Sequence, residues 1–241
     1  AATRRALQAN SVVSAATFQA GTLAPGQIIS VFGQNLASGA QNATALPLPT
    51  ILRTTRALLT VAGVDRPLPL FYVSNTQVNA VLPWDMAPGT YNFTVEVGGV
   101  RGNDVQLSVA TFAPGIFTLD GTGRGAGIFL KGDGALVTTA NPATRGSVVA
   151  FYAVGLGAVQ PALGDGAPGR LTDPLNRTTA APRVFFDNLE GTVSYSGIAP
   201  GFAGLYQINV QVPAGLSPAS NIPVSITIGG VASNRVTIPV Q

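Results

Sequence analysis

The two halves of the sequence repeat each other, and this internal repeat constrains the fold more than any other feature. Three segments recur in the same order along the chain, which indicates the duplication of one folding unit. The boundary is predicted near residues 110–115, where Ala113, Pro114 and Gly115 interrupt the strand pattern. The matching segments are PGQIISVF (25–32) with RGSVVAFY (145–152), TQVNAVLP (76–83) with YQINVQVP (206–213), and VEVGGV (95–100) with ITIGGV (226–231).

Each half consists of short runs of β-branched and aromatic residues separated by Gly, Pro and Asn, without a sustained helical period. A Gly-Gly pair between two such runs predicts a hairpin, because both turn positions tolerate positive φ. The sequence therefore predicts an all-β fold of two tandem immunoglobulin-like β-sandwich domains, residues 1–112 and 113–241, with an N-terminal strand-like extension. The predicted strands are residues 27–33, 57–64, 69–74, 77–82, 90–98, 105–110, 147–154, 183–187, 191–196, 205–212, 222–228 and 235–240.

Composition excludes several classes of protein. Hydrophobic residues make up 46% of the chain and charged residues 10%, the opposite of the balance in a disordered protein. The net charge of +3 is spread thinly, with Arg4 and Arg5 as the only adjacent basic pair, so no nucleic-acid partner is expected. No apolar run reaches the ~18 residues of a membrane span. The chain begins with Ala rather than Met, which is consistent with removal of a leader and equally with trimming of the sequence.

His and Cys, two residue types that many enzymes use in catalysis, are missing from the sequence. Without His or Cys, neither the histidine-based nor the thiol-based nucleophile systems can form, and thiolate metal sites are excluded. A Ser–Lys pair would need Lys131, which has no serine near it in sequence. A carboxylate pair can hydrolyse glycosides, but the closest candidates, Asp187 and Glu190, flank a predicted hairpin turn. The protein is therefore predicted to be non-enzymatic and to bind no cofactor.

Gly-rich segments offer superficial similarity to ligand-binding loops. Residues 121–127 (GTGRGAG) resemble a phosphate loop, but a strand and a turn are predicted after them instead of the required helix. We therefore interpret this segment as a loop at a domain interface. Asp120, Asp133 and Asp165 all lie in Gly-rich turns, where a turn-forming role is favoured over calcium binding.

Two aromatic side chains have predicted structural or interface roles. Trp84, between Pro83 and Asp85, is in a loop position, and with Met86 it forms a candidate interface or packs over the end of its own sandwich. Tyr206, at the start of a late strand, suits a structural tyrosine corner.

Three asparagines satisfy the acceptor pattern for N-glycosylation: Asn42, Asn92 and Asn176. Asn176, in a polar loop, is the best placed of these.

Four further segments are characteristic: residues 73–79 (VSNTQVN), 113–117 (APGIF), 120–123 (DGTG) and 200–213 (PGFAGLYQINVQVP). With these segments, the chain resembles the Solibacter-type C-terminal domain family of secreted acidobacterial proteins. The resemblance covers about residues 10–241 and implies immunoglobulin-like folds related to those of plexins, and an extracellular location. The family supplies no established catalytic residues.

Residues 1–9 precede the part of the chain that resembles this family, and residues 6–14 can form a strand. Because an open sandwich edge is a template for pairing, this strand is predicted to add to the sheet edge of a neighbouring copy. Donor and acceptor surfaces differ, so repetition would give a head-to-tail filament, an extracellular homopolymer. The predicted assembly strand is Leu7, Gln8, Ala9, Asn10, Ser11, Val12 and Val13.

The alternative is a monomeric secreted module that binds a surface glycan or another protein through its loops. It predicts aromatic side chains gathered at one set of loops, such as Trp84 with Phe112 or Phe202. In its simplest form, residues 1–13 pair with their own first domain.

Overall fold

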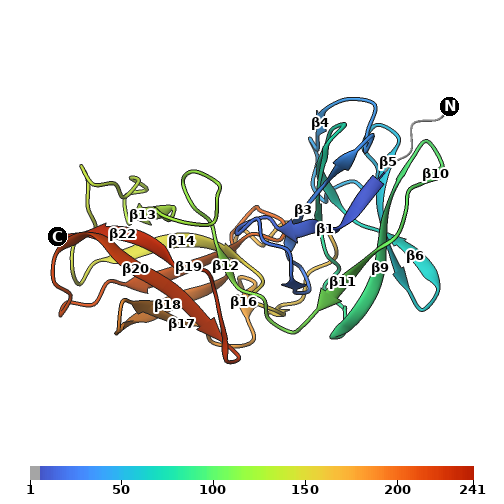
Figure 1. Ribbon diagram of the computed structural model, residues 1–241. Helices are drawn as coiled ribbons and strands as arrows, with labels where there is room; N and C mark the ends of the chain where they lie inside the picture. The colour runs from blue at the N-terminus through green and yellow to red at the C-terminus, as the bar shows by residue number, and fades with distance from the viewer. Residues whose placement is uncertain (1–5) are drawn as a thin grey trace.

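The computed structural model describes residues 6–241, and all regular elements in that range are β-strands (Figure 1). Two sheets come from residues 6–109, here called the N-terminal half, and a third comes from residues 115–240 of the C-terminal half. Figure 1 shows the two halves meeting at an angle near β12. The predicted all-β class is confirmed. No helix in the described part of the chain has the length and apolar character needed to cross a membrane.

The first sheet has the N-terminal strand at its edge, and neighbouring strands in it run antiparallel. Its central ladder joins β3 to β8, with Ile28 opposite Val81, Ser30 opposite Asn79 and Phe32 opposite Gln77. The strand order is β1 (Ala6–Ser14), β3 (Ile28–Gln34), β8 (Gln77–Val81), β7 (Leu70–Val73) and β4 (Gln41–Asn42).

The second sheet shows how alternation in the sequence selects a buried face. In β11, Val105, Leu107 and Val109 are buried while Gln106 and Ser108 are exposed, because successive side chains of a strand point to opposite faces. The strand order is β2 (Thr22–Leu23), β11 (Val105–Val109), β9 (Gly89–Val97), β5 (Thr55–Val61) and β6 (Val64–Pro67), with β10 (Val100–Arg101) on β9.

The third sheet folds over through its long strand β18, which pairs with β17 at its start and with β19 along the rest. A bulge between Val193 and Tyr195 accompanies this change of partner. The main order is β12 (Gly115–Ile116), β14 (Val148–Val154), β19 (Tyr206–Gln211), β18 (Leu189–Ile198), β17 (Arg183–Phe186), β20 (Ala219–Ile228) and β21 (Val231–Ala232). The branches are β13 (Phe129–Lys131) on β14, β16 (Arg177–Thr178) on β18, β15 (Val159–Gln160) on β16 and β22 (Val236–Val240) on β20.

Both predicted Gly-Gly hairpins form. Gly98 and Gly99 have φ of 59° and 77°, and Gly229 and Gly230 have φ of 56° and 80°. Val97 pairs directly with Val100 across the first turn, as Ile228 does with Val231 across the second. Positive φ at both positions is accessible to glycine without a steric penalty, which is why the same dipeptide recurs in both repeats.

The repeated segments occupy equivalent places in the two halves. The first pair of repeated segments lies largely in β3 and β14, and the second pair lies largely in β8 and β19. In the first half β3 pairs antiparallel with β8, and in the second half β14 pairs antiparallel with β19. Each half also has its own buried cluster, one containing Ile29 and Phe93 and the other Phe151 and Ile208. The structure therefore agrees with a duplicated folding unit.

The segment predicted as an assembly strand is β1 of its own chain. Leu7, Val12 and Val13 are buried, and β1 pairs with β3. Six residues of β1, from Leu7 to Val12, lie opposite only three residues of β3, from Gly33 to Val31, and this bulge leaves residues 8–10 exposed. Residues 1–5 of the predicted extension lie outside the described residues.

Candidate functional site

The two halves are held together by a carboxylate from the C-terminal half. The Asp165 carboxylate accepts hydrogen bonds from Nη2 of Arg66 at 2.5 Å and from the backbone N–H of Trp84 at 3.1 Å. Arg66 also donates to Asp85 at 2.5 Å. Partial burial acts to lower the pKa of the Arg66 guanidinium, but the hydrogen bonds and charges of Asp85 and Asp165 together outweigh it and raise the pKa above its ordinary value. Asp165 thus has a bridging role that its Gly-rich turn did not predict.

Trp84 lies at the same junction. Its indole meets the ring of Tyr206 edge-on, with 6.2 Å between ring centroids, and packs against the core of the C-terminal half. The backbone of Gly26 passes so close that a Cβ there would stand 2.2 Å from the indole. Met86, paired with Trp84 as a candidate interface, instead lies in the core of the N-terminal half. Trp84 therefore contacts the other half of its own chain.

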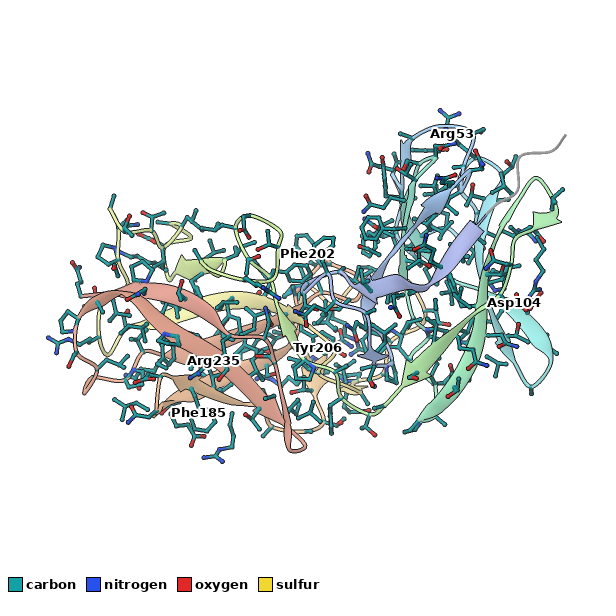
Figure 2. All side chains as sticks on the ribbon, viewed as in Figure 1. Arg53, Asp104, Phe185, Phe202, Tyr206 and Arg235 are labelled. Carbon is teal, nitrogen blue, oxygen red and sulfur yellow. The ribbon has the colours of Figure 1, made fainter. Side chains whose placement is uncertain are left out.

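Further contacts fix how the halves sit. Leu48 and Val81 of the N-terminal half pack with Ala203 of the C-terminal half. The Leu48 N–H donates to the Gly166 carbonyl at 2.9 Å, and the loop of residues 200–204 approaches the backbone of Gly26. Figure 2 shows Phe202 and Tyr206 close to this junction. With so many segments in contact, the junction behaves as a packed interface rather than a flexible linker.

A groove lies on the outer face of the first sheet. In β3 the side chains of Ile29 and Val31 enter the core, so Ile28, Ser30 and Phe32 take the opposite face. In β8, Gln77 and Asn79 share that outer face. The groove has a volume of about 480 Å³. It is lined by Ala15, Phe18, Ile28, Ser30, Asn42, Ala43, Phe71, Tyr72, Gln77, Asn79 and Phe117.

Aromatic rings stand at both ends of this groove. Phe18, 41% exposed, lies in the turn after β1, and its ring centroid is 6.2 Å from that of Phe32 at an interplanar angle of 37°. Phe71 and Tyr72 are contributed by β7. Phe117 comes from the C-terminal half, directly after β12. The groove is therefore completed only when both halves are in place.

Amide groups form the middle of the groove. Nε2 of Gln77 donates to Oδ1 of Asn79 at 2.8 Å, which orients both amides. The remaining atoms of the two amides, Oε1 of Gln77 and Nδ2 of Asn79, make no hydrogen bond within residues 6–241. One acceptor and one donor group therefore remain for a ligand. The lining contains no Asp, Glu, Lys or Arg. Such a surface suits a neutral ligand that has both apolar faces and hydrogen-bonding groups.

The candidate catalytic and metal-binding residues are engaged elsewhere. Asp187 is in the β17–β18 turn with φ of 55°, and the Glu190 carboxylate accepts two hydrogen bonds from the Arg183 guanidinium, at 2.9 and 2.6 Å. Asp120 and Asp133 accept backbone N–H groups two residues ahead, the predicted turn role. No group of three or more potential metal-ligating side chains of His, Cys, Asp or Glu gathers in the described residues.

The Gly-rich segment 121–127 is a loop that lies against the N-terminal half. The strand β13 follows it, without a helix to bind phosphate. The Gly123 N–H donates to Thr118 at 2.9 Å, and a Cβ on Gly123 would stand 2.5 Å from the Thr17 backbone. This agrees with the interpretation of the segment as a domain-interface loop.

The glycosylation candidates differ in accessibility. Asn42 and Asn92 are exposed, and Asn42 is part of the groove lining. Asn176, favoured by the sequence, is only 1% exposed. Its Nδ2 donates to the Pro161 carbonyl at 2.6 Å and its Oδ1 accepts from the Arg170 N–H at 2.8 Å. A glycan on Asn176 would therefore require this buried pair of hydrogen bonds to break.

Tyr206 has a structural role, although its geometry differs from a tyrosine corner. The side chain is fully buried, and its hydroxyl donates to the backbone carbonyl of Gly157, far away in sequence rather than a few residues upstream. Burial raises the pKa of the phenol well above its ordinary value. The hydroxyl therefore stays protonated as a donor.

The residues that line the groove were not predicted as a site, although one pattern in the sequence indicates two of them. Gln77 and Asn79 belong to the repeat and match Gln207 and Asn209, so these polar pairs recur at outward positions of equivalent strands. Polar residues preserved between repeats on the outer face of a sheet are not needed by the core, which makes them candidates for recognition. No local signal marks Phe18 in the turn after β1.

Comparisons with known proteins give a likeness of fold only. No protein-family model and no curated protein matches the sequence. SGBP-B of the Bacteroides ovatus mixed-linkage glucan utilization locus, in complex with a mixed-linkage heptasaccharide, is 13% identical, with a TM-score of 0.36 over 91% of this chain and 42% of that chain. Domains 5–6 of the S-layer protein SbsC are 13% identical, with a TM-score of 0.29 over 98% of each chain.

The I9–I11 tandem of titin is 10% identical, with a TM-score of 0.20 over 91% of this chain and 95% of that chain. The present chain spans less than half the length of the first of these three structures. At such low identities and TM-scores, none of these likenesses carries an inference about function, which has to come from the chain's own residues.

Proposed function

We propose that the protein is a non-enzymatic extracellular binding module that holds a neutral saccharide in the groove on the first sheet. We also propose that the chain forms two immunoglobulin-like domains, residues 1–112 and 113–241, and that it belongs to the Solibacter-type family. The extracellular location follows from the secreted proteins in which that family occurs. The observation that carries the function is the composition of the groove, in which aromatic rings and paired amides occur together without any Asp, Glu, Lys or Arg side chain.

Saccharides match this composition better than other ligand classes. A sugar ring offers C–H faces that pack on aromatic rings such as Phe18 and Tyr72, and hydroxyl groups that exchange hydrogen bonds with the amides of Gln77 and Asn79. Anionic or cationic ligands would be desolvated here without a compensating charge. The groove is also held by a packed sheet, so little ordering is needed on binding.

Calorimetric titration against soluble neutral polysaccharides (β-glucan, xylan and galactomannan) tests the proposal. We expect at least one to bind, and Phe18→Ala to weaken that affinity about tenfold, equivalent to roughly 1.4 kcal/mol. The matched control is Phe185→Ala, which removes a partly exposed ring from β17 of the C-terminal half (Figure 2), a strand that contributes no residue to the groove lining. If none of the polymers binds, or if both variants bind as the wild type does, the proposed function is wrong.

Filament formation through the N-terminal strand is the second candidate, favoured by the edge position of β1 in its sheet. Because β1 is paired with β3 in its own chain, donation to a neighbour requires an exchange of strands between copies. Deletion of residues 1–13 would also remove buried Leu7 and Val12, so loss of filaments in that variant would be ambiguous.

A sharper test loosens β1 without deleting it. Asn103→Ala removes the side chain that holds the backbone of Leu7. If strand exchange drives assembly, negative-stain microscopy of this variant at high concentration should show more or longer filaments than the wild type. Uniform monomers in both proteins would contradict the assembly candidate.

A further inference from the structure

The polar motif in the middle of the groove recurs on the third sheet. Tyr152 stands opposite Gln207 and Ala150 opposite Asn209, as Phe32 stands opposite Gln77 and Ser30 opposite Asn79. Nε2 of Gln207 donates to Oδ1 of Asn209 at 2.8 Å, the same distance as in the first half. Each half therefore presents an aromatic ring beside an oriented amide pair.

Both copies of the motif lie on outer faces. The side chains of Phe151 and Ile208, which alternate with those of the second motif, are buried in the core. Tyr152, Gln207 and Asn209 themselves are partly exposed. Amide groups that are oriented by one mutual hydrogen bond, and remain accessible, are preorganised to contact a ligand.

Phe117 connects the two motifs. It lines the groove on the first sheet, yet its backbone N–H donates to the Tyr152 carbonyl at 3.2 Å, extending the ladder between β12 and β14. Ile116 enters the core, so Phe117 takes the outer face, next to Tyr152. On the neighbouring strand β18, Tyr195 pairs with Asn209, and the Arg177 guanidinium covers its ring at 4.9 Å from the ring centroid.

We propose that the groove on the first sheet continues across the junction, through Phe117 and Tyr152, to the amide pair of Gln207 and Asn209. This binding track runs from Tyr72 to Asn209 and has two equivalent subsites for sugar rings, one at the Gln77–Asn79 pair and one at the Gln207–Asn209 pair. Its occupant is a linear neutral saccharide chain long enough to reach both subsites. The inference rests on the proposed function and adds to it the length of the ligand and the part played by the C-terminal half.

A series of linear oligosaccharides, from disaccharides to octasaccharides of cellulose, xylan and mannan, tests the track by calorimetry. The affinity of the wild type should rise with the length of the oligosaccharide until both subsites are filled. Tyr152→Ala should leave the affinity for the shortest ligand that binds unchanged and lower the affinity for the longest about tenfold, because only the long chain reaches the second subsite. Phe18→Ala should weaken ligands of every length.

The two proposals fail in distinguishable ways. If Phe18→Ala weakens binding but Tyr152→Ala has the same small effect at every length, the track ends within the first half, and only the further inference is overturned. If Phe18→Ala changes nothing, or no oligosaccharide binds, the groove itself is not a saccharide site. Gln207→Ala, which removes one amide from an outward position, should reproduce the length dependence of Tyr152→Ala.

Discussion

The side chain of Asn103 makes two hydrogen bonds with the backbone of Leu7, 96 residues away in sequence. Oδ1 of Asn103 accepts from the Leu7 N–H at 2.9 Å, and Nδ2 donates to the Leu7 carbonyl at 2.9 Å. An amide side chain has one acceptor and two donors, so it can satisfy both backbone groups as a neighbouring strand would. Asn103 thus joins the loop between β10 and β11 of the second sheet to the edge strand of the first.

The C-terminal half has the same arrangement. Asn234 accepts from the Ile116 N–H at 2.7 Å and donates to the Ile116 carbonyl at 3.0 Å. Asn103 and Asn234 each lie five residues after the first glycine of their Gly-Gly hairpins. Ile116 belongs to β12, the neighbour of β14, as Leu7 belongs to β1, the neighbour of β3. The duplication therefore preserved a clamp on the edge strand in each half.

Replacement of Asn103 by Ala should lower the free energy of unfolding by about 2 kcal/mol, since two hydrogen bonds to partly buried backbone groups are lost. Chemical denaturation measures the change. Asn92→Ala, an exposed asparagine in β9, is the matched control and should change stability by less than about 0.5 kcal/mol. Equal effects of the two substitutions would show that the clamp contributes nothing.

The junction between the halves should depend on Asp165 more than on Asp85, although both accept from Arg66. Asp165→Ala removes the only one of these carboxylates that also holds the Trp84 N–H, and its side chain is 26% exposed against 70% for Asp85. We expect a loss of about 1–2 kcal/mol for Asp165→Ala and less than about 0.5 kcal/mol for Asp85→Ala in chemical denaturation. A larger loss for Asp85→Ala would contradict the assignment.

Removal of the Tyr206 hydroxyl should destabilise the C-terminal half without disturbing its packing. Tyr206→Phe leaves the Gly157 carbonyl without this buried donor, at a cost of about 1–2 kcal/mol in thermal or chemical denaturation. Tyr91→Phe serves as the control, because the Tyr91 hydroxyl donates to the Ala87 carbonyl at an exposed position. The Tyr91 variant should lose about 0.5 kcal/mol or less, and a reversed order would refute the role given to Tyr206.

Asp65 should make stability depend on pH in the acid range. The hydrogen bond from Thr60, followed by the contact with Arg101, lowers the pKa of its carboxyl below 3.8 despite slight desolvation. A lowered folded-state pKa gives stability that is present above the unfolded pKa and is lost as pH falls through the folded value. The stability difference between wild type and Asp65→Asn should therefore be largest near neutral pH and shrink below about pH 4.

This difference should stay below about 1 kcal/mol, because the Asp65 side chain is 35% exposed and solvent screens its ion pair. Urea denaturation of both proteins between pH 7 and pH 2 measures it. A difference that grows as the solution is acidified would contradict the lowered pKa.

Local patterns in the sequence predicted most of the strands and both Gly-Gly hairpins. The prediction for residues 77–82 became β8 (Gln77–Val81), and that for residues 235–240 became β22 (Val236–Val240). Period-2 alternation and glycine turns are properties of neighbouring residues, so a sequence displays them directly. The bulge in β1 could not be predicted in this way, because it depends on the register with β3.

The candidate site could not be predicted from the sequence, because it too depends on contacts between residues that are far apart in the chain. Phe18, Tyr72 and Phe117 meet only after the sheet has formed and the halves have packed together. Asp165 and Arg66 are 99 residues apart, and nothing in the turn around Asp165 marks it as a bridge. The buried state of Asn176 likewise follows from tertiary contacts with Pro161 and Arg170, which the polar character of its loop concealed.

Saccharide binding in the groove is tested most directly by a ¹H–¹⁵N NMR titration with a linear neutral oligosaccharide that binds. The titration follows the side-chain amides of Gln77, Asn79, Gln207 and Asn209. We expect the signals of the Gln77 and Asn79 amides to shift with short and long chains, and those of the Gln207 and Asn209 amides to shift only with long ones. If the side-chain amides of Gln77 and Asn79 remain unchanged at saturation while other signals move, the saccharide binds elsewhere and the proposed site is wrong.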